Sequence, residues 1–216
     1  MTTPRHVTDQ HDQAVQDGTL SIDRLDVIAP GAFAAAVAPL FEGARLFLGR
    51  LAMARPFGSV EELFARAREI AHAMPLEEKL ELIDAHPRLG APPAEVSVLS
   101  YVEQGYGLAG TERTAEGIAG EAVEATAAET ARNEAEAERT RIAAELDRLN
   151  AAYEARFGFR YCVFVAGRSR AELLPEMTAA LEAPREAEIT RALDAVIDIA
   201  RDRYATLTAA AAEDPA

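Results

Sequence analysis

The feature that most constrains the fold of this chain is a bend that contains Pro87, Gly90, Pro92 and Pro93. A helical pattern precedes the bend and another follows it. The first pattern reads PLEEKLELIDA and contains Leu76, Leu80 and Ile83, whose spacing is typical of one buried helical face. Pro87 disfavours helical geometry at the residue before it, so this helix should end near His86. We therefore expect His86 at the end of a helix, directly before the bend.

The second pattern follows the prolines of the bend and carries Ser100, Glu103 and Gln104. Their i, i+3, i+4 spacing places them on one helical face. If this face turns toward His86, an imidazole and a carboxylate meet beside a hydroxyl and an amide, a set suited to proton transfer on a polar ring. The same Ser-x-x-Glu spacing also describes a capping box, in which Ser100 and Glu103 only satisfy backbone donors. Spacing alone favours this structural alternative.

Four short motifs occur in series along the chain: His86-Pro87-x-Leu89-Gly90, Ser100-x-x-Glu103-Gln104, Leu149-Asn150-x-x-Tyr153 and Phe157-Gly158-Phe159. In this order they resemble the OHCU decarboxylase family, whose members convert 2-oxo-4-hydroxy-4-carboxy-5-ureidoimidazoline (OHCU) into (S)-allantoin during urate breakdown. The resemblance extends from about Leu25 to Leu207. It implies an all-α fold, a single compact multi-helix domain with one short extended segment near residues 160–166. It also implies a homodimer.

The resemblance also implies roles for individual residues. His86 would transfer the proton, with a pKa near the working pH, and Glu103 would hold the imidazole or a substrate hydroxyl. Arg203 would fix a carboxylate or carbonyl oxygen through its planar guanidinium. Arg160 stands where the family commonly has proline, either as an extra cation beside the substrate or as a subfamily difference. The substrate-binding positions would be Pro87, Ser100, Tyr101, Val102, Glu103 and Gln104, with the main chain of Arg160, Tyr161, Cys162, Val163 and Phe164.

Arg203 also stands out without the resemblance. The last helix, from about Glu186, has an apolar stripe formed by Ile189, Leu193, Val196, Ile197, Ala200, Tyr204 and Leu207. Arg203 follows Val196 by seven residues and so shares its face, whereas Arg201 points away from it. A buried arginine needs a partner because burying an unpaired charge is costly. The pattern leaves a carboxylate and a bound substrate equally open, and the resemblance favours the substrate.

The composition excludes several classes of protein. The net charge of −14 argues against binding to nucleic acid or to anionic membranes, because no basic patch is present to displace counterions. The apolar stretches are too short for a membrane span. The single cysteine excludes an internal disulfide and a multi-cysteine metal site, and it fits a cytoplasmic protein. No residues have metal-ligand spacing, and the substrate ring can accept the electrons that decarboxylation leaves, so we expect neither metal nor cofactor.

The expected organisation is one helical domain over residues 22–209 between two disordered tails, 1–21 and 210–216. An Ala- and Glu-rich helical insertion should occupy about residues 113–141. A helix is expected from Val60 to Ala73, capped by Ser59, with His72 as a surface residue near its end. The residues from Tyr161 to Val165 have the composition of a buried strand, but we follow the resemblance and expect an extended wall of the active site.

Three functions fit these residues. The first is cofactor-independent OHCU decarboxylation. The second is a cofactor-free lyase or hydrolase acting on a related ureido acid, which no residue excludes. The third is a non-catalytic helical interaction protein, which the joint presence of His86, Glu103 and Arg203 disfavours.

Overall fold

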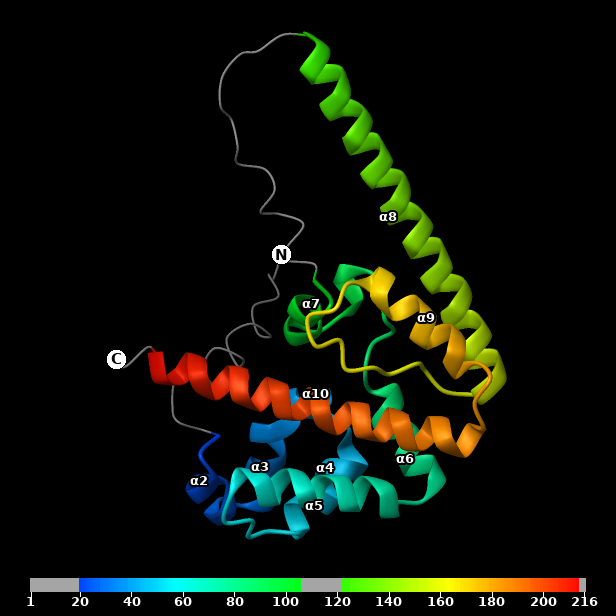
Figure 1. Cartoon of the computed structure of the whole chain (residues 1–216). Coiled ribbons are helices and arrows are strands. Elements are labelled where there is room, and N and C mark those ends of the chain that lie inside the picture. The colour runs from blue at the N-terminus through cyan, green and yellow to red at the C-terminus, as the bar shows by residue number, and fades with distance from the viewer. Residues whose placement is uncertain (1–19, 106–121, 214–216) are drawn as a thin grey trace, which may run out of the picture. The chain divides into compact units, whose positions relative to one another are not determined.

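The computed structural model describes residues 20–105 and 122–213, and their regular structure is entirely helical (Figure 1). In these two ranges there are nine α-helices, two 3₁₀ helices and no strands, which confirms the expected all-α fold. The helices are α2 (Ile22–Val27), α3 (Pro30–Val37), η1 (Ala38–Phe41), α4 (Arg45–Met53), α5 (Val60–Ala73), α6 (Leu76–Asp84), η2 (Pro93–Glu95), α7 (Val98–Glu103), α8 (Ala122–Phe157), α9 (Arg170–Ala180) and α10 (Arg185–Glu213). No helix in these ranges combines the length and the apolar character that crossing a membrane requires.

The chain divides into two compact units. Unit 1 contains the residues up to His86 together with those from Glu186 onward, and unit 2 is Pro87–Arg185. The expected helical domain therefore has an internal division. It falls between His86 and Pro87, at the bend that follows α6.

The core of unit 1 forms between α10 and the helices from α3 to α6. The predicted stripe of α10 is buried from Ile189 to Tyr204, and Arg203 lies on the same buried face. The aromatic rings of Phe41 and Phe47 pack 4.8 Å apart in this core. The helical period therefore identified the buried face of α10 correctly, because a helix of eight turns repeats its pattern many times.

The prediction for the buried face of α6 was wrong in part. Leu76 is 46% exposed, and the fully buried residues are Leu82 and Ile83. Leu76 is the first residue of this nine-residue helix. A helix of two and a half turns gives the period too few repeats to fix its phase, so the apolar spacing alone pointed to a neighbouring face.

The cap of α5 is as predicted, since the Ser59 hydroxyl accepts from the backbone N–H of Glu62.

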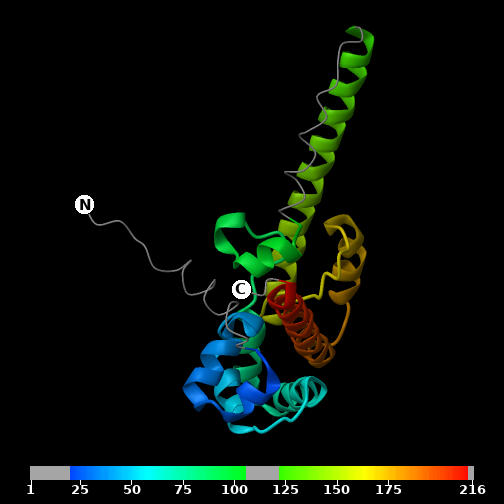
Figure 2. The same cartoon turned by 90° about the vertical axis from the view of Figure 1, so that its left-hand side faces the viewer.

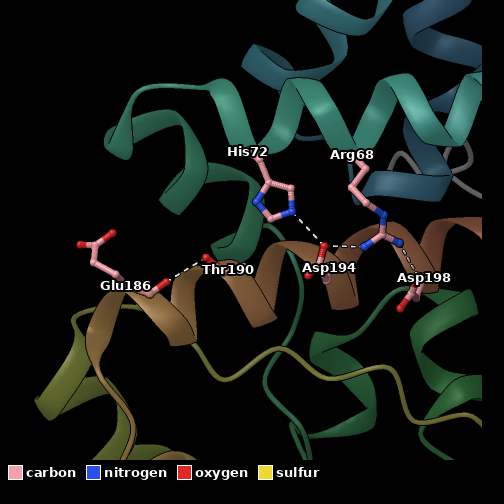
Figure 3. Close-up of polar contacts among 6 residues, drawn as sticks. All are labelled: Arg68, His72, Glu186, Thr190, Asp194 and Asp198. Carbon is pink, nitrogen blue, oxygen red and sulfur yellow. Dashed lines mark hydrogen bonds and ion pairs between the residues drawn. The ribbon is translucent and has the colours of Figure 1, made fainter.

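A polar cluster joins α5 to α10 within unit 1 (Figure 3). Further along α5, Arg68 donates to Asp194 and Asp198, and His72 Nε2 lies 2.8 Å from Asp194 Oδ1. His72 is thus a partly exposed residue, as expected, with a carboxylate partner on α10.

Unit 2 is built around α8, one continuous helix of 36 residues. Its C-terminal part packs against α9, and its N-terminal part extends beyond α7 and α9 (Figures 1 and 2). Residues 122–141 of the expected insertion are therefore part of the same helix as the Leu149–Phe157 motifs. Residues 129–141 are all exposed. Their helix is supported by Ala-rich composition and by ion pairs one turn apart, such as Arg139 with Glu136.

An aromatic cluster closes the other end of α8. Gly158 ends the helix with a φ of 79°, a left-handed conformation that glycine adopts without steric cost. The ring of Tyr153 contacts those of Phe157, Phe159 and Tyr161 at 4.5, 5.6 and 5.1 Å. The chain from Arg160 to Val165 forms neither helix nor strand, at the place where the short extended segment was expected near residues 160–166.

Some expectations lie at or beyond the limits of the described ranges. Residues 1–19 of the expected N-terminal tail and residues 113–121 of the expected insertion lie outside them. At the C-terminus, α10 continues to Glu213. Residues 210–213, which we expected in a disordered tail, are therefore helical.

Candidate active site

His86 occupies a buried position immediately after α6. The helix ends at Asp84, and the His86 backbone N–H still donates to Ile83 O at 3.1 Å, so the last turn tightens and carries the imidazole inward. Only 3% of the residue is exposed. Its Nδ1 lies 3.3 Å from the carbonyl oxygen of Leu82 and donates to it in the tautomer that this contact favours. In that tautomer Nε2 is the nitrogen that accepts a proton.

The surroundings of His86 keep its imidazole neutral. Burial lowers the pKa of His86 to about 4, and the positive charge of Arg203 acts in the same direction. The negative charge of Glu42 and the hydrogen bond to Leu82 oppose this shift. The pKa therefore lies below the near-neutral value that we expected from the residue type. In the unliganded protein at neutral pH, His86 is a proton acceptor.

Arg203 is buried and has a carboxylate partner. Only 2% of its side chain is exposed, and its Nη2 donates to Glu42 Oε1 at 2.8 Å. Its Nη1 lies 3.0 Å from the carbonyl oxygen of Pro39 and 3.5 Å from that of Leu40. One guanidinium thus binds three acceptors, two in η1 and one on the residue that follows it. Of the two partners that the sequence left open, the carboxylate is present in the structure.

Glu42 is the residue that sequence reasoning missed. It follows η1 in a left-handed conformation, with φ 49° and ψ 30°, and 13% of its side chain is exposed. Its partner Arg203 lies 161 residues away along the chain, so no local pattern in the sequence connects the two. The structure therefore brings together two predicted residues, His86 and Arg203, and adds Glu42.

The third predicted catalytic residue, Glu103, lies in unit 2 at the end of α7. Ser97 caps this helix by accepting from the backbone N–H of Ser100. Ser100 is thus inside the helix and 2% exposed, so the capping box between Ser100 and Glu103 is not formed. The pairing of Glu103 with His86 stays a prediction.

Gln104 holds the bend that follows Pro87. Its Oε1 accepts from the Gly90 backbone N–H at 2.8 Å, and its Nε2 donates to Arg88 O at 3.3 Å. The buried side chain of Asn150 donates to Leu89 O at 3.0 Å. Three consecutive backbone positions of the bend are therefore fixed by side-chain amides, which gives Gln104 a structural task besides any contact with substrate.

The remaining predicted substrate-binding residues differ in exposure. Val102 is 67% exposed on α7, and Tyr101 is partly exposed. In the extended segment, Tyr161, Cys162 and Val163 are buried, whereas Arg160, Phe164 and, in the bend, Pro87 are partly exposed. Burial of three consecutive side chains agrees with a segment that would offer its main chain.

Two further features of unit 2 are separate from the predicted site. Arg168 donates to the carbonyl oxygens of Phe164 and Val165 and pairs with Glu176, so the basic turn before α9 has a structural role. A groove between α8 and α9 includes Ile142, Leu174 and Pro175 in its lining and none of the predicted site residues. In the part of the chain that the structure describes, no three His, Cys, Asp or Glu side chains form a group that could hold a metal ion.

Comparison with known proteins gives consistent matches. The sequence model of the OHCU decarboxylase family matches residues 27–120 and 108–205. A relative from Haloferax volcanii, 2-oxo-4-hydroxy-4-carboxy-5-ureidoimidazoline decarboxylase, is 26% identical and covers 86% of this chain and 95% of its own length. The Bacillus subtilis uric acid degradation bifunctional protein PucL is 29% identical over 78% of this chain. The matched region spans only 28% of that longer protein.

Two solved structures share the fold. An OHCU decarboxylase crystallised in the presence of (S)-allantoin has a TM-score of 0.54 and 21% identity, with 80% of this chain and 96% of that chain covered. An (S)-allantoin synthase has a TM-score of 0.55 and 15% identity, with 87% of this chain and 54% of that chain covered. At these identities the similarity concerns the helical architecture.

Proposed function

Because this chain belongs to the OHCU decarboxylase family, we propose that it converts OHCU into (S)-allantoin and carbon dioxide in urate degradation. One observation carries the proposal furthest: the span matched by the family contains His86, Glu103 and Arg203, and unit 1 buries the first and last of these beside Glu42. A neutral imidazole next to a buried guanidinium suits a reaction that binds an anion and then moves one proton.

The reaction requires an exchange of carbon dioxide for a proton. The bond from the ring carbon to its carboxylate breaks, carbon dioxide leaves, and the electron pair remains on the ring and its carbonyl groups. A proton then bonds to the same carbon, on the face that gives the S product. In this proposal His86 delivers that proton through Nε2, while the Leu82 carbonyl holds the imidazole by Nδ1.

His86 must first gain the proton that it delivers. Its pKa of about 4 makes it neutral before substrate binds. A substrate carboxylate close to the imidazole favours the charged form and so raises this pKa. The anion and the proton would therefore bind together, and loss of the carboxylate would lower the pKa again at the moment when the proton is needed.

The other predicted residues complete the proposed site. Arg203 would attract the anionic substrate, and Glu103 would orient the imidazole or the substrate hydroxyl. Pro87, the residues from Ser100 to Gln104, and the main chain from Arg160 to Phe164 would enclose the ring. We further propose a cytoplasmic homodimer, as the family resemblance and the single cysteine suggest. Sedimentation equilibrium would test the dimer, and cell fractionation would test the location.

The activity is tested with freshly generated urate oxidation products, which contain OHCU before it decays. The protein should accelerate the loss of OHCU and yield (S)-allantoin, followed by the circular dichroism of the product. The His86→Gln variant provides the control for spontaneous decay. Racemic allantoin formed at the uncatalysed rate would refute the proposal, and turnover of a related ureido acid alone would support the alternative lyase or hydrolase.

A further inference from the structure

We propose that Glu42 is a positioning residue of this site, which holds the Arg203 guanidinium in place and balances its charge beside His86. The inference rests on the proposed function and extends it to a residue outside the predicted catalytic set. It is carried by the contacts of Glu42, by its backbone conformation and by its charge.

The contacts place Glu42 and Arg203 in one rigid arrangement. Glu42 Oε1 accepts from Nη2 at 2.8 Å, while Nη1 faces the carbonyl oxygens of Pro39 and Leu40. All three acceptors belong to η1 and the residue that follows it. A planar guanidinium held at both terminal nitrogens has little freedom to rotate. Glu42 is the charged member of this set, and it is nearly buried.

The backbone at Glu42 is strained. Its φ of 49° lies in the left-handed region, and the next residue, Gly43, also has a positive φ of 72°. A glycine would adopt the first of these conformations without steric cost. The chain instead keeps a glutamate there, in a conformation that places its carboxylate on the guanidinium. Strain of this kind is characteristic of functional sites, where the surrounding structure compensates for it.

The charge of Glu42 acts on His86. Arg203 disfavours the protonated imidazole, and Glu42 favours it. Without Glu42, the effect of the Arg203 charge on the imidazole would lose this opposing negative charge, and His86 would be harder to protonate. Glu42 thus allows the same site to contain a cation for the substrate and an imidazole that can still be protonated.

The test compares Glu42→Gln, which removes the charge, with Glu42→Asp, which keeps the charge but shortens the side chain. A shift of about 1 Å in a group that positions the reacting atoms can lower the rate about a hundredfold. We expect kcat of Glu42→Gln to fall by about this factor while KM changes much less. Its activity should also require lower pH, because His86 is harder to protonate. Glu42→Asp should lose kcat by a smaller factor and keep the wild-type pH profile.

Glu188→Gln is the matched control. Glu188 is also a buried carboxylate on an arginine, since 4% of its side chain is exposed and it pairs with Arg191. It lies on the helix that carries Arg203, 15 residues before it, or about 22 Å along the axis at 1.5 Å per residue. This variant should lose stability and retain the kcat and the pH profile of the wild type.

An NMR titration of His86, assigned with His86→Gln, separates this inference from the proposed function. The titration midpoint should be lower in Glu42→Gln than in the wild type, and unchanged in Glu188→Gln. This comparison holds even if the wild type does not decarboxylate OHCU, in which case only the proposed function fails. Equal midpoints, or a folded Glu42→Gln with wild-type kcat and pH profile, would overturn the inference. If Glu42→Gln does not fold, a Glu42→Asp variant with wild-type kcat would overturn it.

Discussion

Replacing Arg203 by methionine tests how much stability depends on its buried ion pair. Methionine fills a similar length without charge, so Glu42 would lose its ion pair with Arg203 while its side chain is only 13% exposed. The carbonyl oxygens of Pro39 and Leu40 would lose a donor as well. Removing one partner of a buried ion pair costs about 3–5 kcal/mol. For a chain of this length each kcal/mol lowers Tm by about 2–4 °C, so Tm should fall by about 6–20 °C.

Replacing Arg203 by lysine separates structure from catalysis. Lysine still neutralises Glu42, but one ammonium group cannot reproduce the fork that also reaches η1. The loss of one or two hydrogen bonds costs about 0.5–1.5 kcal/mol each, so Tm should fall by about 1–12 °C, less than in the methionine variant. If Arg203 also stabilises the reacting substrate, kcat/KM should fall about a hundredfold.

The assay measures Tm by circular dichroism and turnover of freshly generated OHCU for both variants. Arg201→Met is the control, because Arg201 lies on the same helix but is exposed, and it should change neither quantity. A lysine variant that turns over near the wild-type rate, together with a destabilised methionine variant, would assign Arg203 to the scaffold alone. A methionine variant with wild-type Tm would refute the magnitude derived from the ion pair.

Four other outcomes are expected. His86→Gln should keep the fold by circular dichroism and lose nearly all activity, and wild-type turnover would contradict its assignment. Burial lowers the pKa of His86 from 6.5 to about 4. The stability that depends on the neutral imidazole is therefore complete above about pH 6.5 and is lost as the pH falls toward 4. In urea unfolding, the free energy of unfolding of the wild type should fall by about 3 kcal/mol more than that of His86→Gln over this range. Dialysis against EDTA should leave turnover unchanged, and activity restored by zinc or manganese would contradict a cofactor-free mechanism. Replacing most of residues 118–141 by a short linker should preserve activity, because the described side chains from 129 to 141 are exposed; a folded but inactive deletion variant would place the segment at the site or at a required interface.

The parts of the fold that the sequence predicted are those governed by local rules. The cap at Ser59 follows from a hydrogen bond to the residue three positions ahead. The buried face of α10, including Arg203, follows from a period repeated over a long helix. In α6 the same rule identified the wrong leucine as buried, because the helix is short.

The parts that local reasoning missed depend on contacts between distant residues. No spacing rule connects Glu42 with Arg203, and the pKa of His86 depends on burial by the whole unit rather than on its neighbours in sequence. The segment from Tyr161 to Val165 has the composition of a strand, yet its first ring packs against Tyr153 and no strand pairs with it in the described ranges. Here the resemblance to a family corrected what propensity alone would have predicted.

Because α8 is continuous, the orientation of its N-terminal part is fixed by that of its buried C-terminal part. Thirty-six residues at 1.5 Å each give an axis of about 54 Å. Because the helix has no break before Phe157, a fluorophore or protein fused at its N-terminal end would turn by about 100° with each residue added or removed. Asn150 and Tyr153 are buried near the other end of the same helix. The number of residues between the buried end and the reporter would therefore set the direction in which the reporter points. A rotation of the helix at its buried end would change the orientation of the fluorophore, which fluorescence can measure.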